Sequence, residues 1–217
     1  MKKFAIILAG NGVYDGAEIQ EVVLTMLAIK QQSCDYQCFA PDIPQHHVIN
    51  HLNGEEMNET RNVLIESARI ARGDIKNLSE FNVYDFDALI FPGGFGVAKN
   101  LCSIAFDGAK ASVNEEVSKA VIKMHKNKKP IGALCIAPAL IAKIIGNGLN
   151  VTVGQDEATA NTIEQMGAIH IETDHGDVVL DEENLIFTSP CYMLDANISQ
   201  IYDGAYNTVE AMIKMMD

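Results

Sequence analysis

Short strand-like runs alternate along the chain with longer segments that repeat apolar residues at helical spacing. The strand-like runs are apolar and bounded by turn residues, which is typical of buried strands. They occupy residues 4–9, 36–41, 87–91 and 130–134. Helical segments are expected at residues 19–27, 62–72, 113–126 and 137–145. This alternation predicts a doubly wound, mostly parallel α/β sheet with helices on both faces.

The C-terminal part of the chain changes its pattern. A short strand at 151–154 and a helix at 156–167 come first. Two strand-like runs within 177–190 then flank the turn sequence DEEN and predict a β-hairpin, and a last helix is expected over 197–216. Residues 42–59 have no single periodicity and are predicted to form an excursion. No repeat or linker interrupts the chain, so residues 1–217 are expected to form a single domain.

Composition and charge narrow the classes of partner. Hydrophobic residues make up 48% of the 217 positions, and the formal net charge is −13 at pH 7. This charge opposes binding to nucleic acid or to an anionic membrane. The first apolar run is too short for a membrane span and lacks a cleavage-site pattern, so a cytoplasmic location is expected. The five dispersed cysteines predict free thiols, and the spacing of Cys34 and Cys38 predicts no metal site.

The candidate chemistry lies in loops that follow strands. Ligands of doubly wound sheets bind at the carboxyl ends of the strands. Cys135 stands where the fourth strand turns at once into a helix, and backbone N–H groups there favour a thiolate, which predicts a lowered thiol pKa. A buried structural cysteine fits the spacing equally well. The loop PGGFG suits an oxyanion hole or an ordinary turn, and Glu18 and Glu21 suit catalysis or a helix start.

Several segments resemble those of a known family and together cover nearly the whole chain. They read IILAGNGVYDGAEIQEVVLTMLAI, FAPD, VINHLNGEEMNETRNVLIESARIARGDI, DALIFPGGFGVAKNL, CIAPA and TSPCYML. By these segments the chain resembles the sigma cross-reacting protein 27A family, also called the isoprenoid-biosynthesis-enhancing glyoxalases. That family belongs to the PfpI and Parkinson-associated deglycase superfamily. The resemblance therefore implies a class I glutamine amidotransferase-like, flavodoxin-like fold.

The resemblance also implies roles for individual residues. Cys135 matches the nucleophile at the elbow, and the backbone N–H groups of Gly94 and Ile136 match those that line the oxyanion pocket. Glu21 matches the carboxylate that hydrogen-bonds the thiol, by its spacing from the end of the first helix. Glu18 is the alternative, because an insertion in the preceding loop would shift the register by one helical turn.

Two positions depart from the patterns of the superfamily. Its proteases carry His directly after the nucleophile, where this chain has Ile136, and its deglycase-type members carry a His farther downstream, where this chain has Gly154 and Gln155. A Cys–His dyad is therefore not expected. The nearest alternatives in sequence are His170 and His175. Three further histidines fall in the excursion and fit a surface loop or a fold over a pocket: His46, His47 and His51.

The activity that the resemblance implies is a glutathione-independent glyoxalase of low activity. Such a lyase converts glyoxal or a similar small dicarbonyl to a hydroxy acid through a hemithioacetal on Cys135. The resemblance implies no metal or organic cofactor, and it implies a homodimer. A redox or stress-responsive binding protein with an oxidisable Cys135 is the alternative from another class. A cysteine peptidase or amidotransferase is a third reading, which the absence of His after Cys135 disfavours.

Overall fold

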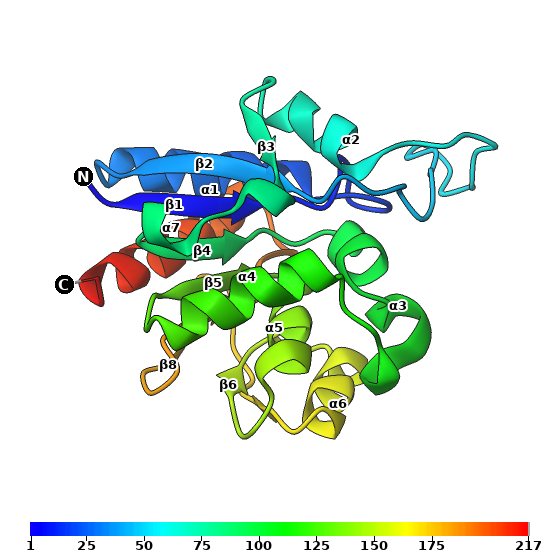
Figure 1. Ribbon diagram of the computed structural model, residues 1–217. Helices are drawn as coiled ribbons and strands as arrows, with labels where there is room; N and C mark the ends of the chain where they lie inside the picture. The colour runs from blue at the N-terminus through cyan, green and yellow to red at the C-terminus, as the bar shows by residue number, and fades with distance from the viewer. Residues whose placement is uncertain (217) are drawn as a thin grey trace.

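A seven-stranded, mostly parallel sheet forms the centre of the protein (Figure 1). The structure is a computed structural model that describes residues 1–216. The strand order is β3-β2-β1-β4-β5-β9-β8, and the β8–β9 pair is antiparallel. The bounds are β1 Lys3–Ile7, β2 Asp35–Ala40, β3 Ile75–Asn77, β4 Ala88–Phe91, β5 Ile131–Leu134, β8 Val179–Asp181 and β9 Ile186–Ser189. The predicted fold class and the C-terminal hairpin are confirmed.

Helices cover both faces of this sheet. Helices α1 (Ile19–Gln31) and α7 (Ile198–Lys214) pack against each other on one face, whereas α4 (Glu115–Lys126) and α5 (Ala137–Ile145) lie on the other (Figure 1). The strands β4, β5 and β9 are consequently buried along their whole length. Burial on both faces explains why these strands read as continuous apolar runs rather than as alternating ones.

The start of several helices follows from a local capping residue. Asn114 caps α4 by accepting the backbone N–H groups of Glu116 and Val117. Asp156 caps α6 (Glu157–Gln165) by accepting the N–H of Thr159 at 2.8 Å. A side-chain acceptor at this position satisfies a backbone donor that the helix itself leaves free. The helix expected at residues 156–167 is therefore confirmed, with Asp156 at its N-cap.

The order of the strands creates a switch point beside β1. The chain winds outward through β1, β2 and β3, returns to the other side of β1 for β4, and then continues to β5. The loops after β1 and β4 therefore leave the carboxyl edge of the sheet at the point where the winding reverses. Ligands bind at such a point in open α/β sheets. The loop after β5 joins them at the same edge, because β4 and β5 are parallel neighbours.

The structure contains short elements that the sequence pattern did not predict. β3 is a three-residue edge strand, and the segment Val97–Leu101 is a π-helix followed by the single-turn helix α3 (Ile104–Asp107). The expected strand at 151–154 is wrong in extent: β6 is Asn150–Val151 and pairs with β7 (Ile169–His170) outside the main sheet. Gly154 has a φ of +71°, so the chain turns before that segment can continue as a strand.

The predicted excursion leaves the carboxyl edge as a narrow loop. Its two sides are joined by isolated bridges at Pro44–Asn62 and Ile49–Glu56, and helix α2 (Val63–Ile70) follows. The loop extends beyond the body of the molecule in Figure 1. Within residues 1–216, no helix has the length and apolar character that a membrane crossing requires.

Candidate active site

Cys135 occupies a sharp elbow between β5 and α5. β5 ends at Leu134, α5 begins at Ala137, and the φ of Cys135 is +58°, in the left-handed region that non-glycine residues rarely adopt. The backbone N–H of Cys135 donates to the carbonyl of Ser189 on the neighbouring strand at 3.0 Å, which helps to hold this conformation. A residue with a strained backbone at the carboxyl edge of the sheet, where ligands bind, points to function rather than to simple packing.

Glu21 lies directly beside this cysteine. It is fully buried in the first turn of α1, and its carboxyl group hydrogen-bonds the Cys135 thiol. Its Oε2 accepts the N–H of Gly93 at 2.7 Å, and its Oε1 accepts the N–H of Tyr192 at 3.2 Å. The two backbone donors come from the loops after β4 and β9. They fix the orientation of the carboxyl group toward the sulfur.

Glu18 is close to the same site but has a different set of contacts. It is the N-cap residue of α1, and its Oε2 accepts the N–H of Glu21 at 2.6 Å. Its own N–H donates to the carbonyl of Gly93 at 2.9 Å. Burial raises the pKa of Glu18, and its charge acts on Glu21. Of the two carboxylates that the sequence left open, the structure therefore brings Glu21 to the thiol and uses Glu18 as the helix cap.

The backbone N–H groups of Gly94 and Ile136 are directed at the Cys135 sulfur. Both positions were expected to supply N–H groups from the resemblance. Gly94 has a φ of +97°, and a side chain there would meet the backbone of Ala17 at 2.8 Å. A glycine is therefore required where the loop after β4 passes α1.

Gly93 is a site residue that the sequence reasoning missed. A Cβ atom on Gly93 would lie 2.7 Å from Glu21 Oε2 and 2.9 Å from the Cys135 sulfur. The absence of a side chain lets the backbone N–H approach the carboxyl group. The two adjacent glycines in the sequence PGG were the signal that could have pointed to Gly93. In the structure the two have different partners: the N–H of Gly93 contacts the Glu21 carboxyl group, and the N–H of Gly94 contacts the Cys135 sulfur.

Burial controls the protonation of Glu21. Loss of water raises its pKa to about 8, and the neighbouring Glu18 charge adds to the effect. The N–H groups of Gly93 and Tyr192 act in the opposite direction but do not offset it. Burial disfavours the charged form of any carboxyl group, which accounts for the sign of the shift. Glu21 therefore retains a proton at neutral pH and can donate it to the sulfur.

The predicted lowering of the Cys135 pKa is wrong. Burial raises the pKa of this thiol well above its ordinary value, and the charge of Glu21 raises it further. The N–H groups of Gly94 and Ile136 lower it, as the helix start predicted, but their effect is smaller. The elbow therefore holds a thiol and a carboxyl group that share protons as a coupled pair.

A cavity of about 420 Å³ opens above the Cys135 sulfur. Its wall includes the backbone groups already described and the side chains of Tyr192 and Asp156. The remaining lining residues that sequence reasoning missed are Val13, Phe95, Thr159 and Met193. Tyr192 and Met193 belong to the segment TSPCYML, which was one of the matching segments. The cavity is large enough for a small aldehyde.

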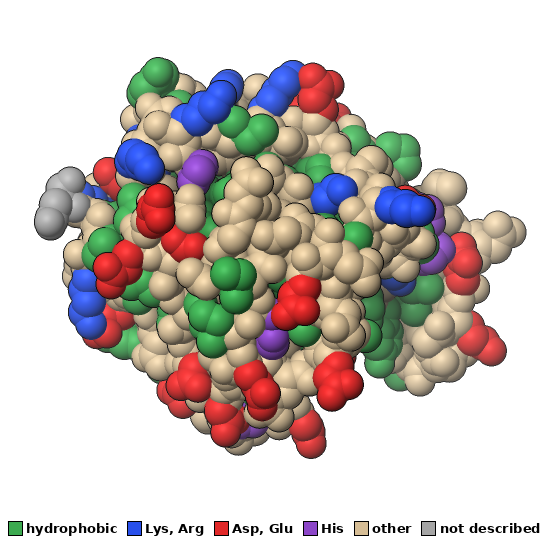
Figure 2. All heavy atoms as spheres, turned by 90° about the horizontal axis from the view of Figure 1, so that it is seen from below, with side chains coloured by type: hydrophobic (Ala, Val, Ile, Leu, Met, Phe, Trp, Pro, Cys, Tyr) green, Lys and Arg blue, Asp and Glu red, His purple; other side chains and the backbone are tan. Residues whose placement is uncertain are grey.

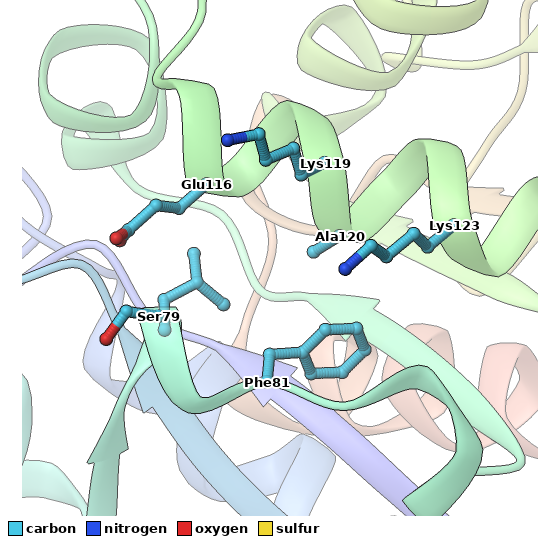
Figure 3. A pocket seen from close by; sticks show the side chains of 7 residues that line it. Ser79, Phe81, Glu116, Lys119, Ala120 and Lys123 are labelled. Carbon is cyan, nitrogen blue, oxygen red and sulfur yellow. The ribbon is translucent and has the colours of Figure 1, made fainter.

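A second depression, of about 260 Å³, lies between α4 and the turn at Leu78–Glu80 (Figure 3). Phe81 and the side chains of Lys119 and Lys123 line it, whereas no cysteine or histidine does. It is distinct from the cavity above Cys135 and shares no lining residue with it.

None of the six histidines lines the Cys135 cavity. His170 lies on β7 and His175 beside Asp174, so neither sequence alternative forms a dyad with the sulfur. His51 packs on the loop after β1, where its Nε2 accepts the N–H of Tyr14 at 3.2 Å. His46 and His47 pack against Phe106, with ring centroids 4.3 Å and 5.8 Å from that of the phenyl ring. Over residues 1–216, no group of three or more His, Cys, Asp or Glu side chains is placed to hold a metal ion.

Comparison with known proteins identifies relatives over nearly the whole chain. The family model "DJ-1/PfpI family" matches residues 6–193. The human protein "Glutamine amidotransferase-like class 1 domain-containing protein 3, mitochondrial" is 40% identical over 98% of this chain and 83% of its own length. The crystal structure of an isoprenoid biosynthesis protein with an amidotransferase-like domain from Ehrlichia chaffeensis is 37% identical, with a TM-score of 0.91 over 98% of this chain and 99% of that chain.

A more distant structural neighbour is glyoxalase III from Candida albicans. It has a TM-score of 0.63 and 14% sequence identity over 100% of this chain and 98% of that chain. At this identity the likeness establishes a shared fold.

Proposed function

The chain belongs to the DJ-1/PfpI family, and we propose that it is a glutathione-independent glyoxalase of low activity. The observation that carries the proposal is the hydrogen-bonded Cys135–Glu21 pair, buried at the base of a cavity. Glyoxal or a similar small dicarbonyl is the proposed substrate. The fold shared with glyoxalase III supports the proposal without carrying it.

The first proposed step joins the sulfur of Cys135 to an aldehyde carbon of glyoxal. The thiol proton passes to the carboxylate form of Glu21, and a carbon–sulfur bond forms to give a hemithioacetal. The N–H groups of Gly94 and Ile136 already point into this region and stabilise the negative oxygen that develops. Proton loss from the coupled pair precedes this step, so the reactive form of the pair holds one proton.

The second step moves a proton between the two substrate carbons. Glu21 first passes the thiol proton to the alkoxide oxygen, which completes the hemithioacetal and restores the Glu21 carboxylate. The carboxylate then takes the proton from the carbon bonded to sulfur, which gives an enediolate, and returns it to the adjacent carbon. The hydroxyl proton on the sulfur-bearing carbon moves to the other substrate oxygen, so that the first oxygen becomes the thioester carbonyl. The product is a thioester of glycolic acid on Cys135. Water then cleaves the carbon–sulfur bond and regenerates the thiol. The sum is glyoxal plus water to glycolic acid, with no external oxidant or reductant.

The test is glycolate formation from glyoxal by the purified protein in the absence of glutathione. Wild-type protein is expected to form glycolate, and Cys135→Ser is expected to form none above the protein-free rate. Equal rates in the two proteins would assign the conversion to something other than Cys135. If the wild-type protein formed no glycolate but its Cys135 were oxidised by peroxide, the redox-sensor alternative would replace the glyoxalase proposal.

Location and assembly remain parts of the proposal. We propose a cytoplasmic homodimer, whereas the human relative carries the word mitochondrial in its name. Cell fractionation and the mass of the purified protein in solution test the two statements separately. A monomeric mass would remove the dimer without affecting the chemistry at Cys135.

A further inference from the structure

The cavity above Cys135 has an unbalanced charge. Of the residues within 1–216 that line it, three are ionisable: Cys135, Tyr192 and Asp156. No lysine, arginine or histidine is among the lining residues. The carboxylate of Asp156 therefore brings a negative charge to the wall without a basic partner in the same wall.

The depression that adjoins the cavity adds no basic side chain to the lining. This depression has a volume of about 200 Å³ and shares Phe95, Ile136 and Thr159 with the cavity, and its other lining residues are uncharged. Lys99 lies over the ring of Phe95, with its Nζ 5.4 Å from the ring centroid. That Nζ donates to the carbonyl of Tyr14 at 2.9 Å, and Lys99 is not part of either lining.

Asp156 is held in place by its role as a helix cap. Its Oδ1 accepts the N–H of Thr159 at 2.8 Å, which leaves the second oxygen of the carboxylate for a ligand. The cap alone does not require the charge, because Asn caps helices about as well as Asp. The carboxylate is thus a feature that helix formation does not explain by itself.

We propose that Asp156 sets the charge preference of the cavity, so that neutral and cationic carbonyl compounds are accepted and anionic ones, such as 2-oxo acids, are rejected. The carbonyl part of this statement rests on the proposed function. The charge preference is a property of the cavity and holds for any reagent that reaches the Cys135 sulfur.

The expected size of the preference follows from the dimensions of the cavity. A volume of about 420 Å³ corresponds to a width of about 9 Å, over which one unit charge changes the binding of another by about 2- to 20-fold. A cation and an anion differ by two charges. Removal of the Asp156 charge should therefore change the ratio of cation binding to anion binding by at least about 4-fold. Acidic side chains are spread over the outer face seen in Figure 2, and they add a general background that salt screens more readily.

The test uses three methanethiosulfonates of similar size that carry a neutral, a trimethylammonium or a sulfonate group. The rate of modification at Cys135 is measured by peptide mass for each reagent. Each rate is divided by the rate with 2-mercaptoethanol, which removes the intrinsic reactivity of the reagent. The variant Asp156→Asn keeps the cap and removes the charge. The matched control is Glu157→Gln, which removes the neighbouring exposed charge from the same helix turn.

Wild-type protein is expected to favour the cationic over the anionic reagent, and Asp156→Asn is expected to reduce this ratio at least about 4-fold. Glu157→Gln should leave the ratio near the wild-type value. The proposal is overturned if Asp156→Asn leaves the ratio unchanged, or if Glu157→Gln reduces it as much. These rates need no turnover, so a charge preference without glycolate formation would reject the glyoxalase proposal while supporting the role of Asp156.

Discussion

Replacement of Glu21 by Gln should change how stability depends on pH, because the burial of this carboxyl group has a cost that only its charged form bears. The unfolded chain releases the proton near pH 4.5, whereas the folded protein keeps it until about pH 8. The folded state therefore binds more protons across this window, and stability falls as the pH rises through it. Below about pH 4.5 Glu21 is protonated in both the folded and the unfolded state, and above about pH 8 the loss of stability is complete.

The magnitude follows from the two pKa values. At 1.36 kcal/mol per pKa unit, the rise to about 8 corresponds to at most about 5 kcal/mol, of which about 3 kcal/mol is lost between pH 5 and pH 8. Gln cannot ionise, so this loss should be absent in Glu21→Gln. Its amide cannot accept both the Gly93 and the Tyr192 N–H groups, which should cost about 1–3 kcal/mol at every pH.

The assay is urea unfolding followed by circular dichroism at several values between pH 5 and pH 8, since the chain has no Trp to report by fluorescence. Glu21→Gln should be less stable than wild type at pH 5, and the difference should disappear or reverse by pH 8. Glu157→Gln is the control, because it removes an exposed carboxylate from a different helix, α6. Parallel curves for wild type and Glu21→Gln would refute the assignment of a buried, proton-retaining Glu21.

Three further predictions concern the reactivity of the same site. Brief iodoacetamide treatment should modify Cys135 before Cys34, Cys38, Cys102 or Cys191, because Cys135 lines the cavity; peptide mapping that finds Cys34 or Cys191 first would reject it as the nucleophile. Glu21→Gln should lower glyoxal turnover by about 10²-fold or more and Glu18→Gln far less, and kinetics with the reverse order would give the role to Glu18. Gly93→Ala should lose about 1–3 kcal/mol in urea unfolding and slow Cys135 alkylation, since the new methyl group overlaps Glu21 and the sulfur; unchanged alkylation would contradict the tight contact.

The sequence predicted the parts of the site that depend on local order. Strand PIGAL, the immediate turn at Cys135 and the doubled glycine after β4 are each readable within a few residues, and parallel winding brings their loops to one edge. Glu21 was also predicted, because the resemblance places the carboxylate at a fixed spacing from the end of the first helix.

Other parts of the site depend on contacts that no local pattern contains. The N–H of Tyr192 reaches Glu21 across 171 positions, and only the placement of β9 beside β5 brings them together. The sign of the Cys135 pKa shift also escaped prediction, because burial and the Glu21 charge outweigh the helix start and both arise from the packed fold. The edge strand β3 and the β6–β7 pair are too short to give a periodic signal.

The most direct test of the account is the isotope content of glycolate formed from glyoxal in D₂O without glutathione. Passage of the proton through Glu21 and an enediol predicts deuterium on the carbon that bears the hydroxyl group, because a carboxyl proton exchanges with solvent. A direct hydride shift between the two carbons would leave that position free of deuterium. The account predicts deuterated glycolate from wild type and none from Cys135→Ser; undeuterated glycolate, or equal formation by the variant, would contradict it.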